Sequence, residues 1–490
     1  MMSEQRNIQR LHPVSIVVNL IKTIKSMIIP LVIILVGRGF EYSLNPTNEN
    51  YYSTLIFIGV GLLIIISVIS LAIIRWRKFV YWFEDGELRV EYGLVITKKR
   101  YIPFERIQSL NYKESIFHRP LKLVSVTVET ASDQKDAEAE LTAVSRQQAE
   151  EIEYQMEIAK QQTIENNKEP LTENQIEKTV IYKVSNKELI LLASTSSSMG
   201  ILFSAIAAIA TQFNEIIPYE EIYGEMQNLI KFGVLFIVLI VLAVVLVSWF
   251  VAIAISYFAN YGFQVIEEDN KLFISKGLLE KKRLTVPMNR IQGITIIENP
   301  IRQIFGYCRV VLISAGGSGE SNEDKTVLLP FVKKSTAIKV LAQLFPQYNL
   351  QQNYIKAPRK SLLRYLLKPQ YYFAIPIVLC SIYFYPIGLF SCVVIPPVLL
   401  LTYWQYKTAA FSINGYQLTM IYRLFSKHTF ITEKKRIQSI TQKQSFFAER
   451  KDIASAVVHV MSGNSGEQAY AKHFDLHEIE EIMAWYKPNH

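Results

Sequence analysis

Four long runs without a charged residue divide the chain. Three of them cover residues 51–74, 189–214 and 232–266. The middle of the third run reads Gly-Val-Leu-Phe-Ile-Val-Leu-Ile-Val-Leu-Ala-Val-Val-Leu-Val between residues 232 and 255. Because a helix of about 20 apolar residues crosses a hydrocarbon layer of roughly 30 Å, each of these runs predicts a membrane-spanning helix.

The fourth run extends over residues 371–404. As a single helix it would be about 51 Å long at 1.5 Å per residue, which is too long for one crossing without strong tilt. The run therefore predicts a hairpin of two short spans that turns near residues 386–388. Such a hairpin keeps the basic flanks on one side of the membrane: Arg364, Lys368 and Lys407. A re-entrant loop is the alternative interpretation.

Near the N-terminus the charge-free stretch is shorter, at residues 26–37, and bases bracket it: Lys22, Lys25 and Arg38. We expect residues 14–27 to lie along the membrane interface and to continue into a span near residues 27–42. A surface helix that never crosses is the alternative. A cleaved signal peptide is disfavoured because a second long span follows at once and no small-residue cleavage site is evident.

Basic residues close to helix ends predict the side on which each loop lies. Seven bases precede or follow the first hairpin: Arg6, Arg10, Lys22, Lys25, Arg75, Arg77 and Lys78. The turn within the second hairpin contains four acids and no base before Lys231: Glu215, Glu220, Glu221 and Glu225. We therefore expect both termini and all large polar segments to be cytoplasmic.

The polar segments that follow the hairpins contain an internal repeat. The tripeptide Arg-Ile-Gln occurs three times: Arg106-Ile107-Gln108, Arg290-Ile291-Gln292 and Arg436-Ile437-Gln438. A leucine follows the residue that lies thirteen positions before each arginine. That residue is Gly93, Gly277 or Arg423. A basic stretch comes next in every copy: Lys98-Lys99-Arg100, Lys281-Lys282-Arg283 and Lys427-His428. Three residues before the arginine the copies have Pro103, Pro287 and Glu433.

Around these motifs the pattern has a period of two, which predicts short antiparallel strands with turns at residues 84–86 and 268–270. An amphipathic helix ends each copy, near residues 145–161, 334–345 and 476–486. About seven strands and one helix per copy suit a bent antiparallel sheet or a partly open barrel capped by its C-terminal helix.

Hairpins and repeats alternate along the chain. The predicted hairpins cover residues 14–74, 189–256 and 362–404. The predicted β-rich domains cover residues 75–162, 257–347 and 405–488, and polar linkers cover 163–188 and 348–361. The sequence thus predicts a membrane protein in which three transmembrane helical hairpins, with six spans, alternate with three cytoplasmic β-rich domains.

These residues resemble the bacterial pleckstrin-homology-like (PH-like) domains of the second class, a family of membrane proteins in which a helical hairpin precedes each domain. The resemblance rests on the Gly-Leu pair, the basic strand, Arg-Ile-Gln, the segment 299–306 with Arg302, and the closing helix. It covers nearly the whole chain in three tandem copies, although the third lacks the glycine and the proline. It implies a seven-stranded, strongly bent antiparallel sheet and a bacterial source, often with a smaller membrane protein that carries one such domain.

Composition agrees with a membrane protein. Of 490 residues, 50% are hydrophobic and only 19% are charged, against about 25% charged in ordinary soluble domains. The net charge is +9. Residues 129–170 contain eleven acids and four bases, so this segment carries −7 and the rest of the chain +16. That excess lies at hairpin flanks and strand edges beside a membrane, which argues against nucleic-acid binding.

Two groups of residues are candidate sites. The basic strands, Lys98, Lys99, Arg100, Lys281, Lys282 and Arg283, are candidates for contact with anionic lipid head groups, where each base contributes about 1 kcal/mol. The alternative is a solvated strand edge that resists unwanted pairing. The tripeptide side chains Arg106, Gln108, Arg290, Gln292, Arg436 and Gln438 offer a fork for an anion. Their fixed position in three copies favours a structural role, in which they tie a strand to the next turn and the isoleucine lies in the core.

No catalytic or metal-binding pattern is evident, and the three cysteines have the character of packing residues: Cys308, Cys380 and Cys392. We therefore expect no enzymatic activity and no cofactor. The sequence favours a membrane-anchored binding or scaffolding protein of the bacterial plasma membrane, acting in envelope maintenance or defence. Its expected partners are anionic lipids, further copies of the chain, or the smaller PH-like membrane protein. A transporter or lipid-handling protein built from the six spans is the alternative.

Overall fold

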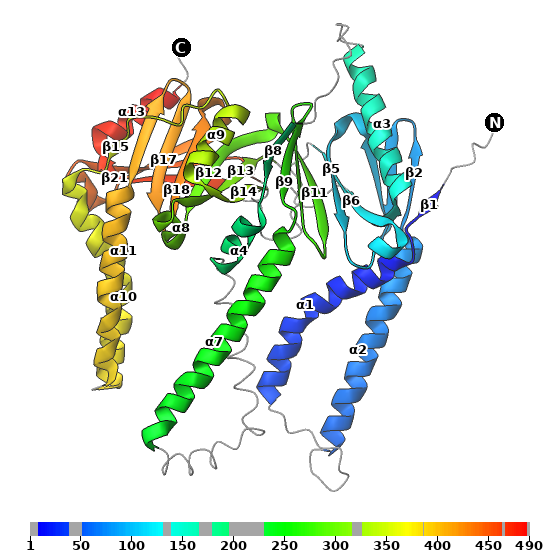
Figure 1. The fold of residues 1–490 in the computed structure, drawn as a ribbon, viewed down its shortest axis with the longest axis horizontal. Helices are drawn as coiled ribbons and strands as arrows, with labels where there is room; N and C mark the ends of the chain where they lie inside the picture. The colour runs from blue at the N-terminus through cyan, green and yellow to red at the C-terminus, as the bar shows by residue number, and fades with distance from the viewer. Residues whose placement is uncertain are drawn as a thin grey trace.

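The computed structural model describes residues 8–38, 51–130, 139–165, 179–195, 230–315, 326–385, 387–462 and 466–487. Three β-rich domains lie in a row, and long helices extend from one side of that row (Figure 1). The N-terminal domain is at one end and the C-terminal domain at the other. Candidate functional sites therefore lie in the row of β-rich domains, in the helices, or where the helices join the domains.

The extending helices form at the apolar runs of the sequence. Their bounds are α1 Val14–Arg38, α2 Tyr51–Lys78, α4 Asn186–Ser194, α7 Ile230–Asn260, α10 Leu362–Tyr383 and α11 Ile395–Thr408, with a 3₁₀ segment, η6, at Ile387–Val394. Among the described residues, two helices are long and apolar enough to cross a membrane, Tyr51–Lys78 and Gly388–Thr408. Shorter apolar helices cover Val14–Ile24 and Val245–Asn260. Most of the predicted span at 189–214 and the predicted turn residue Pro386 lie outside the described residues.

Each β-rich domain contains seven described strands and a closing helix. The first domain has β1 Gln9–Arg10, β2 Val80–Glu84, β3 Glu87–Tyr92, β4 Lys98–Pro103, β5 Ile107–Glu114, β6 Leu123–Thr130, β7 Ala139–Ser145 and α3 Arg146–Glu165. The second has β8 Thr179–Lys183, β9 Gln264–Glu268, β10 Lys271–Lys276, β11 Lys281–Pro287, β12 Ile291–Glu298, α8 Pro300–Ile304, β13 Tyr307–Ser314, β14 Thr326–Lys333 and α9 Lys334–Leu344. The third has β15 Ile355–Lys356, β16 Ala410–Asn414, β17 Gln417–Arg423, β18 Lys427–Glu433, β19 Ile437–Lys443, α12 Phe446–Glu449, β20 Ile453–Val460, β21 Glu467–Asp475 and α13 Leu476–Tyr486.

The first strand of every domain precedes the helical hairpin, which differs from the sequence prediction. The predicted linkers 163–188 and 348–361 contain β8 and β15, which pair with β9 and β16 after the hairpin. In the same way β1 pairs with β2. These strands have two to five residues, too few to show a period-two pattern. The hairpin is therefore inserted between the first and second strands of a domain.

The sheets do not follow the domain borders, which corrects the prediction of one sheet per domain. Their strand orders are β1-β2-β3-β4, β7-β6-β5-β11-β10-β9-β8, β14-β13-β12-β18-β17-β16-β15 and β19-β20-β21. Each domain thus divides into four strands and three strands, joined by a 3₁₀ turn: η1 Phe104–Arg106, η4 Met288–Arg290 and η7 Lys434–Arg436. The three-stranded half of one domain extends the four-stranded half of the next. Alternating patterns reveal which face of a strand is buried but not which strand lies along its edge.

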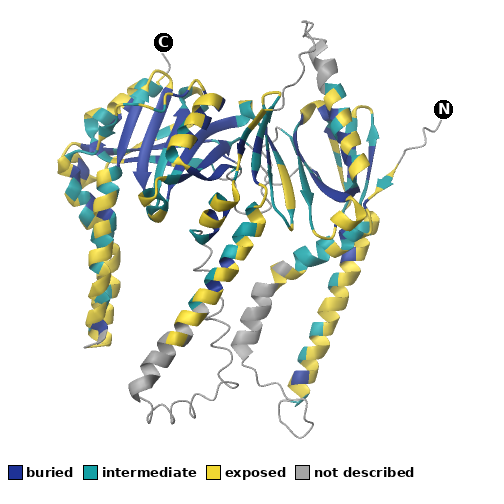
Figure 2. Cartoon of the chain, viewed as in Figure 1, coloured by how far each residue is buried: buried dark blue, intermediate teal, exposed yellow. Residues whose placement is uncertain are grey.

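Among the described residues, one large hydrophobic core lies in each domain (Figure 2). A small fourth cluster of Leu189, Leu192 and Phe331 joins α4 to β14. The large cores are not fully separate. Ile431 of the third domain belongs to the core of the second, and Ile313 of the second belongs to the core of the third. The second and third domains therefore share apolar packing as well as backbone hydrogen bonds.

The backbone conformation explains why the Gly-Leu pair contains glycine. Gly93 has φ +134° and Gly277 has φ +105°, a region that residues with a side chain rarely adopt. A Cβ at either position would overlap the carbonyl oxygen three residues later, that of Ile96 or Glu280. In the third domain Arg423 occupies the position and its Nη2 donates a hydrogen bond to Gln303 Oε1 of the second domain at 2.6 Å.

We expect Gly277→Ala to lower the stability of the chain by about 1–3 kcal/mol, the usual cost of a strained backbone conformation. The measurement is thermal unfolding of the purified protein in detergent. Gly59→Ala in α2 is the control, because a Cβ there meets nothing within 4 Å. Equal melting temperatures for the two variants would contradict this account of the motif.

Candidate functional site

The first interdomain junction is the antiparallel pairing of β5 with β11. Its register places Glu114 opposite Lys281 and Tyr112 opposite Arg283. Beyond these pairs, Thr285 donates two hydrogen bonds across the junction, from its N–H to Asn111 Oδ1 at 3.0 Å and from its hydroxyl to the Leu110 carbonyl at 3.1 Å. Backbone and side chains together therefore fix one register between the first and second domains.

An ion triad closes the end of this junction that lies beside α7. The carboxylate of Glu280 lies 3.1 Å from the Nζ atoms of both Lys113 and Lys282. Burial raises the pKa of Glu280, but the charges of Lys282 and Lys113 outweigh this effect, and the pKa lies below its ordinary value. The carboxylate thus separates two lysines that the register places directly opposite each other.

The second junction, β12 with β18, repeats the register of the first. Glu298 lies opposite Lys427 there. Glu114 and Glu298 each stand eight residues after the arginine of their tripeptide, while Lys281 and Lys427 each stand nine residues before theirs. Two junctions with different sequences therefore have the same geometry.

Glu298 is the most buried acid of the second junction. Its side chain is only 6% exposed and lies 3.3 Å from Lys427 Nζ and 3.1 Å from Lys334 Nζ. Burial raises the pKa of Glu298, but the two lysines lower it by more, so that the pKa lies below its ordinary value. Thr432 adds a hydrogen bond from its hydroxyl to the Gln292 carbonyl at 2.7 Å.

The tripeptide residues lie at the corner between the two halves of a domain. The isoleucines Ile107, Ile291 and Ile437 are buried, and the nearby arginines and glutamines differ between copies. Arg290 donates a hydrogen bond from Nη2 to the Thr130 carbonyl of the first domain at 2.7 Å, and burial lowers its pKa. Gln292 is buried and donates to the Arg290 carbonyl at 3.0 Å.

In the other copies the tripeptide side chains are more accessible. Arg106 and Gln438 are exposed, while Gln108 and Arg436 are half-buried. In the third copy the backbone is held instead, because the Tyr486 hydroxyl donates to the carbonyls of Ile437 and Gln438. The structural role predicted for this motif stays a prediction, with Arg290 providing the most direct interdomain contact.

The two basic strands lie in different surroundings. On β4, Lys98 and Lys99 are exposed and Arg100 lies over the Tyr92 ring at 5.8 Å. No described strand lies on the outer side of β4. On β11, Lys281, Lys282 and Arg283 all lie within the first junction, where Arg283 contacts the Phe273 ring at 4.7 Å. Contact of these bases with lipid stays a prediction. The two strands differ in pairing, because β4 is an open edge among the described strands and β11 is paired on both sides.

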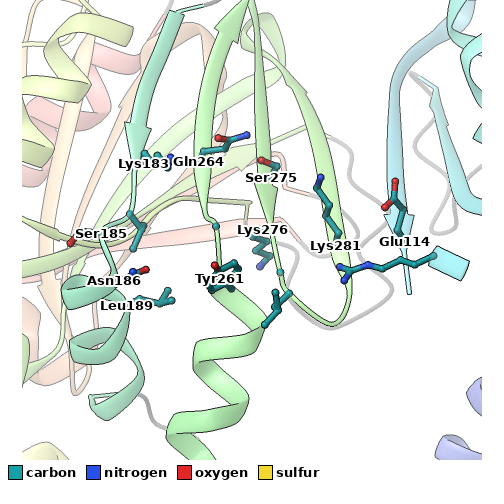
Figure 3. A pocket seen from close by; sticks show the side chains of 15 residues that line it. Glu114, Lys183, Ser185, Asn186, Leu189, Tyr261, Gln264, Ser275, Lys276 and Lys281 are labelled. Atoms are coloured by element: carbon teal, nitrogen blue, oxygen red, sulfur yellow. The ribbon is translucent and has the colours of Figure 1, made fainter. Parts of the chain in front are cut away.

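A basic cleft of about 940 Å³ opens beside the first junction, near the end of α7. Lys183, Lys276 and Lys281 line it together with Glu114 and Arg119 (Figure 3). The sequence prediction missed both this cleft and the junctions. A signal was present, because a glutamate stands eight residues after the arginine of the first two tripeptides and a lysine stands nine residues before the arginine of the last two.

We expect Glu298→Gln to lower the free energy of unfolding at pH 7 by about 1–3 kcal/mol, because it leaves Lys427 partly buried without its carboxylate. Glu480→Gln on the exposed face of α13 is the control. Since the folded pKa of Glu298 is depressed, its contribution is present above about pH 4.3 and is lost as the pH falls through the folded pKa. Thermal unfolding in detergent from pH 3 to 7 measures the difference, and a loss independent of pH would contradict the ionic role.

Comparisons with known proteins identify the family of the three domains. Residues 20–160, 216–347 and 372–490 match the bacterial PH domain family. The chain is 34% identical over 499 residues to the UPF0699 transmembrane protein YdbT of Bacillus subtilis (strain 168), a match that covers 99% of both chains. No solved structure matches. The chain therefore belongs to the bacterial PH domain family and carries its domain in three tandem copies.

Proposed function

We propose that this membrane protein is a scaffold of the bacterial plasma membrane, in which three cytoplasmic PH-like domains form one binding platform. The observation that carries the proposal is the junction register, which is the same in β5–β11 and β12–β18. A surface that joins PH-like domains twice within the chain is suited to joining another one. The proposed role is assembly in envelope maintenance or defence and involves no catalysis.

Two sheet edges support this proposal. Among the described strands, β4 and β19 each have a neighbour on one side only. They are the counterparts of the strands that pair at the internal junctions. At the same register, β19 of one copy on β4 of another would place Lys443 opposite Lys98. The first junction has the same pair, Lys113 opposite Lys282, but there Glu280 lies between the two lysines. Ile96 stands at the position of Glu280 in the first domain, so this lysine pair would lack a carboxylate, and like charges directly opposite each other destabilise a strand pair. We therefore propose a different PH-like domain, with an acidic strand, as the partner of β4.

The proposed topology has six spans with both termini in the cytoplasm. It is supported by the two long apolar helices and by the bases at the ends of the helices next to the β-rich domains. Helices α2 and α11 end in Arg75, Arg77 and Lys78 and in Lys407, respectively. These bases would lie on the cytoplasmic side under the positive-inside rule.

A second candidate function is lipid handling. The observation that favours it is the cleft lined by Lys183, Lys276 and Lys281, which has the size and charge for an anionic head group. The two functions predict different ligands, since a scaffold retains a protein and a lipid-handling protein retains a lipid.

The partner prediction is tested by purifying the full chain from its native membranes with Lys99→Cys on β4, followed by cross-linking and mass spectrometry. We expect a cross-link to a strand of another protein's PH-like domain. Thr97→Glu combined with Lys98→Glu should reduce recovery of that protein at least about tenfold, since it opposes an acidic strand. Lys339→Glu on the exposed side of α9 is the control and should leave the recovery unchanged.

Retained lipid without a cross-linked protein would favour the second function, and cross-links to β19 of another copy would contradict the charge argument.

The topology prediction is tested by labelling single cysteines in intact cells after Cys380 and Cys392 are replaced by serine. A membrane-impermeant reagent should reach Glu215→Cys in the predicted turn of the second hairpin and should not reach Ser318→Cys in the predicted second domain. The reverse pattern would show that the orientation is inverted.

A further inference from the structure

Exposed apolar side chains of the β-rich domains gather in two loops per domain. The first of these loops joins the third and fourth strands. It carries Val95 and Ile96 in the first domain, Leu279 in the second, and Leu424 and Phe425 in the third, all of them exposed. Val95 is 96% exposed. Exposure of a large apolar side chain to water is energetically unfavourable. Because such side chains recur in the same loop of all three domains, they indicate a shared interaction surface.

Each first loop is attached to the helix that leaves the hairpin. In the first domain Lys78, the last residue of α2, donates a hydrogen bond from Nζ to the Leu94 carbonyl at 2.6 Å. In the second, the Leu278 N–H donates to the Phe258 carbonyl of α7 at 2.8 Å. In the third, Gln405 Nε2 of α11 donates to the Leu424 carbonyl at 3.0 Å. These bonds hold the three loops at the level where the helices meet the domains.

The second loop joins the fifth and sixth strands and repeats the pattern. Its exposed apolar residues are Ile116 and Phe117 in the first domain, Ile304 and Phe305 in the second, and Phe446 and Phe447 in the third. In the second and third domains this loop contacts the start of a hairpin. Arg302 donates from Nε to Thr195 Oγ1 at the end of α4, and Arg364 of α10 donates from Nη2 to Ser445 Oγ.

The opposite ends of the same strands are polar. The turn between β2 and β3 is Asp85-Gly86, and the turn between β9 and β10 is Asp269-Asn270. In the first and second domains the strand ends that face away from the helices thus carry acids, whereas the corresponding turn of the third domain is Gly415-Tyr416. The strand ends beside the helices carry apolar residues in all three domains. Bases such as Lys98, Arg119 and Lys281 lie next to the apolar loops. Apolar loop tips surrounded by basic residues are typical of a protein surface that lies in a lipid interface.

We propose that these six loops insert their apolar tips into the leaflet on the side of the β-rich domains, so that the whole row lies on the bilayer. The loops need to penetrate only the boundary between head groups and acyl chains, about 5–10 Å deep. The occupant of this surface is lipid rather than protein, because the loops continue the surface of helices that cross the membrane. The inference does not depend on the scaffold function.

The test uses the full chain with Cys380→Ser and Cys392→Ser, because both are exposed, whereas Cys308 is buried. Single cysteines replace Ile96, Ile304 or Phe425 and carry a polarity-sensitive fluorophore. The protein is reconstituted in vesicles of phosphatidylethanolamine and phosphatidylglycerol, with or without lipid spin-labelled at carbon 5 of an acyl chain. Tyr416→Cys is the matched control, since Tyr416 is 80% exposed but lies in the turn at the far end of β17.

We expect the spin-labelled lipid to quench the three loop labels at least about twofold, as for groups at the acyl boundary, and to leave the Tyr416→Cys label unchanged. Loop labels that behave like the control would overturn the proposal. Loop labels with blue-shifted emission but no quenching by lipid would also overturn it, because they would show that protein covers the loops. If a labelled variant fails to fold, Val95→Cys and Phe305→Cys place the label on neighbouring exposed residues.

Discussion

Antiparallel pairing across the domain borders is the interaction on which the rest of the architecture depends. A PH-like domain alone would leave β5 or β12 as an open edge beside a modest core. Here β11 and β18 cover those edges and add side-chain bonds such as Thr285 to Asn111. Because each seven-stranded sheet draws strands from two domains, one domain cannot rotate against the next without breaking backbone hydrogen bonds. Three small domains thus behave structurally as one row.

The insertion of each hairpin between two paired strands couples this row to the helices. Strands β1 and β2 hold the two ends of the first hairpin together, and Trp76 at the end of α2 donates from Nε1 to the Leu11 carbonyl at 2.8 Å. In the third domain the Ala357 N–H donates to the Ala409 carbonyl at 3.2 Å across the same position. A displacement of either helix would therefore act directly on a sheet. This coupling also fixes the height of the apolar loop between the third and fourth strands of each domain, whose backbone groups bond to the outgoing helix.

The sequence predicts features that repeat locally and misses features that depend on distant strands. The Arg-Ile-Gln tripeptides identify the three copies, and their isoleucines are buried as expected. The closing helix was predicted near residues 476–486 and is observed as α13 at Leu476–Tyr486. By contrast, β15 has two residues and pairs with a strand more than fifty residues later, and no local pattern encodes such a pairing. The difference between the two basic strands is hidden from the sequence for the same reason, since β4 is distinguished from β11 by pairing.

Charge at the two outer edges explains why a row built by repetition need not grow without limit. A head-to-tail contact that does not close generates filaments when every copy has both complementary edges. The internal junctions have glutamate opposite lysine, as in Glu298 and Lys427. At the outer edges the corresponding positions are Gln444 and Thr97, and the next pair would be Lys443 and Lys98, with Ile96 where the first junction has Glu280 between its two lysines. Basic side chains on an exposed edge oppose pairing between identical chains. The same bases would favour an acidic strand, so the features that oppose self-assembly would also select the proposed partner.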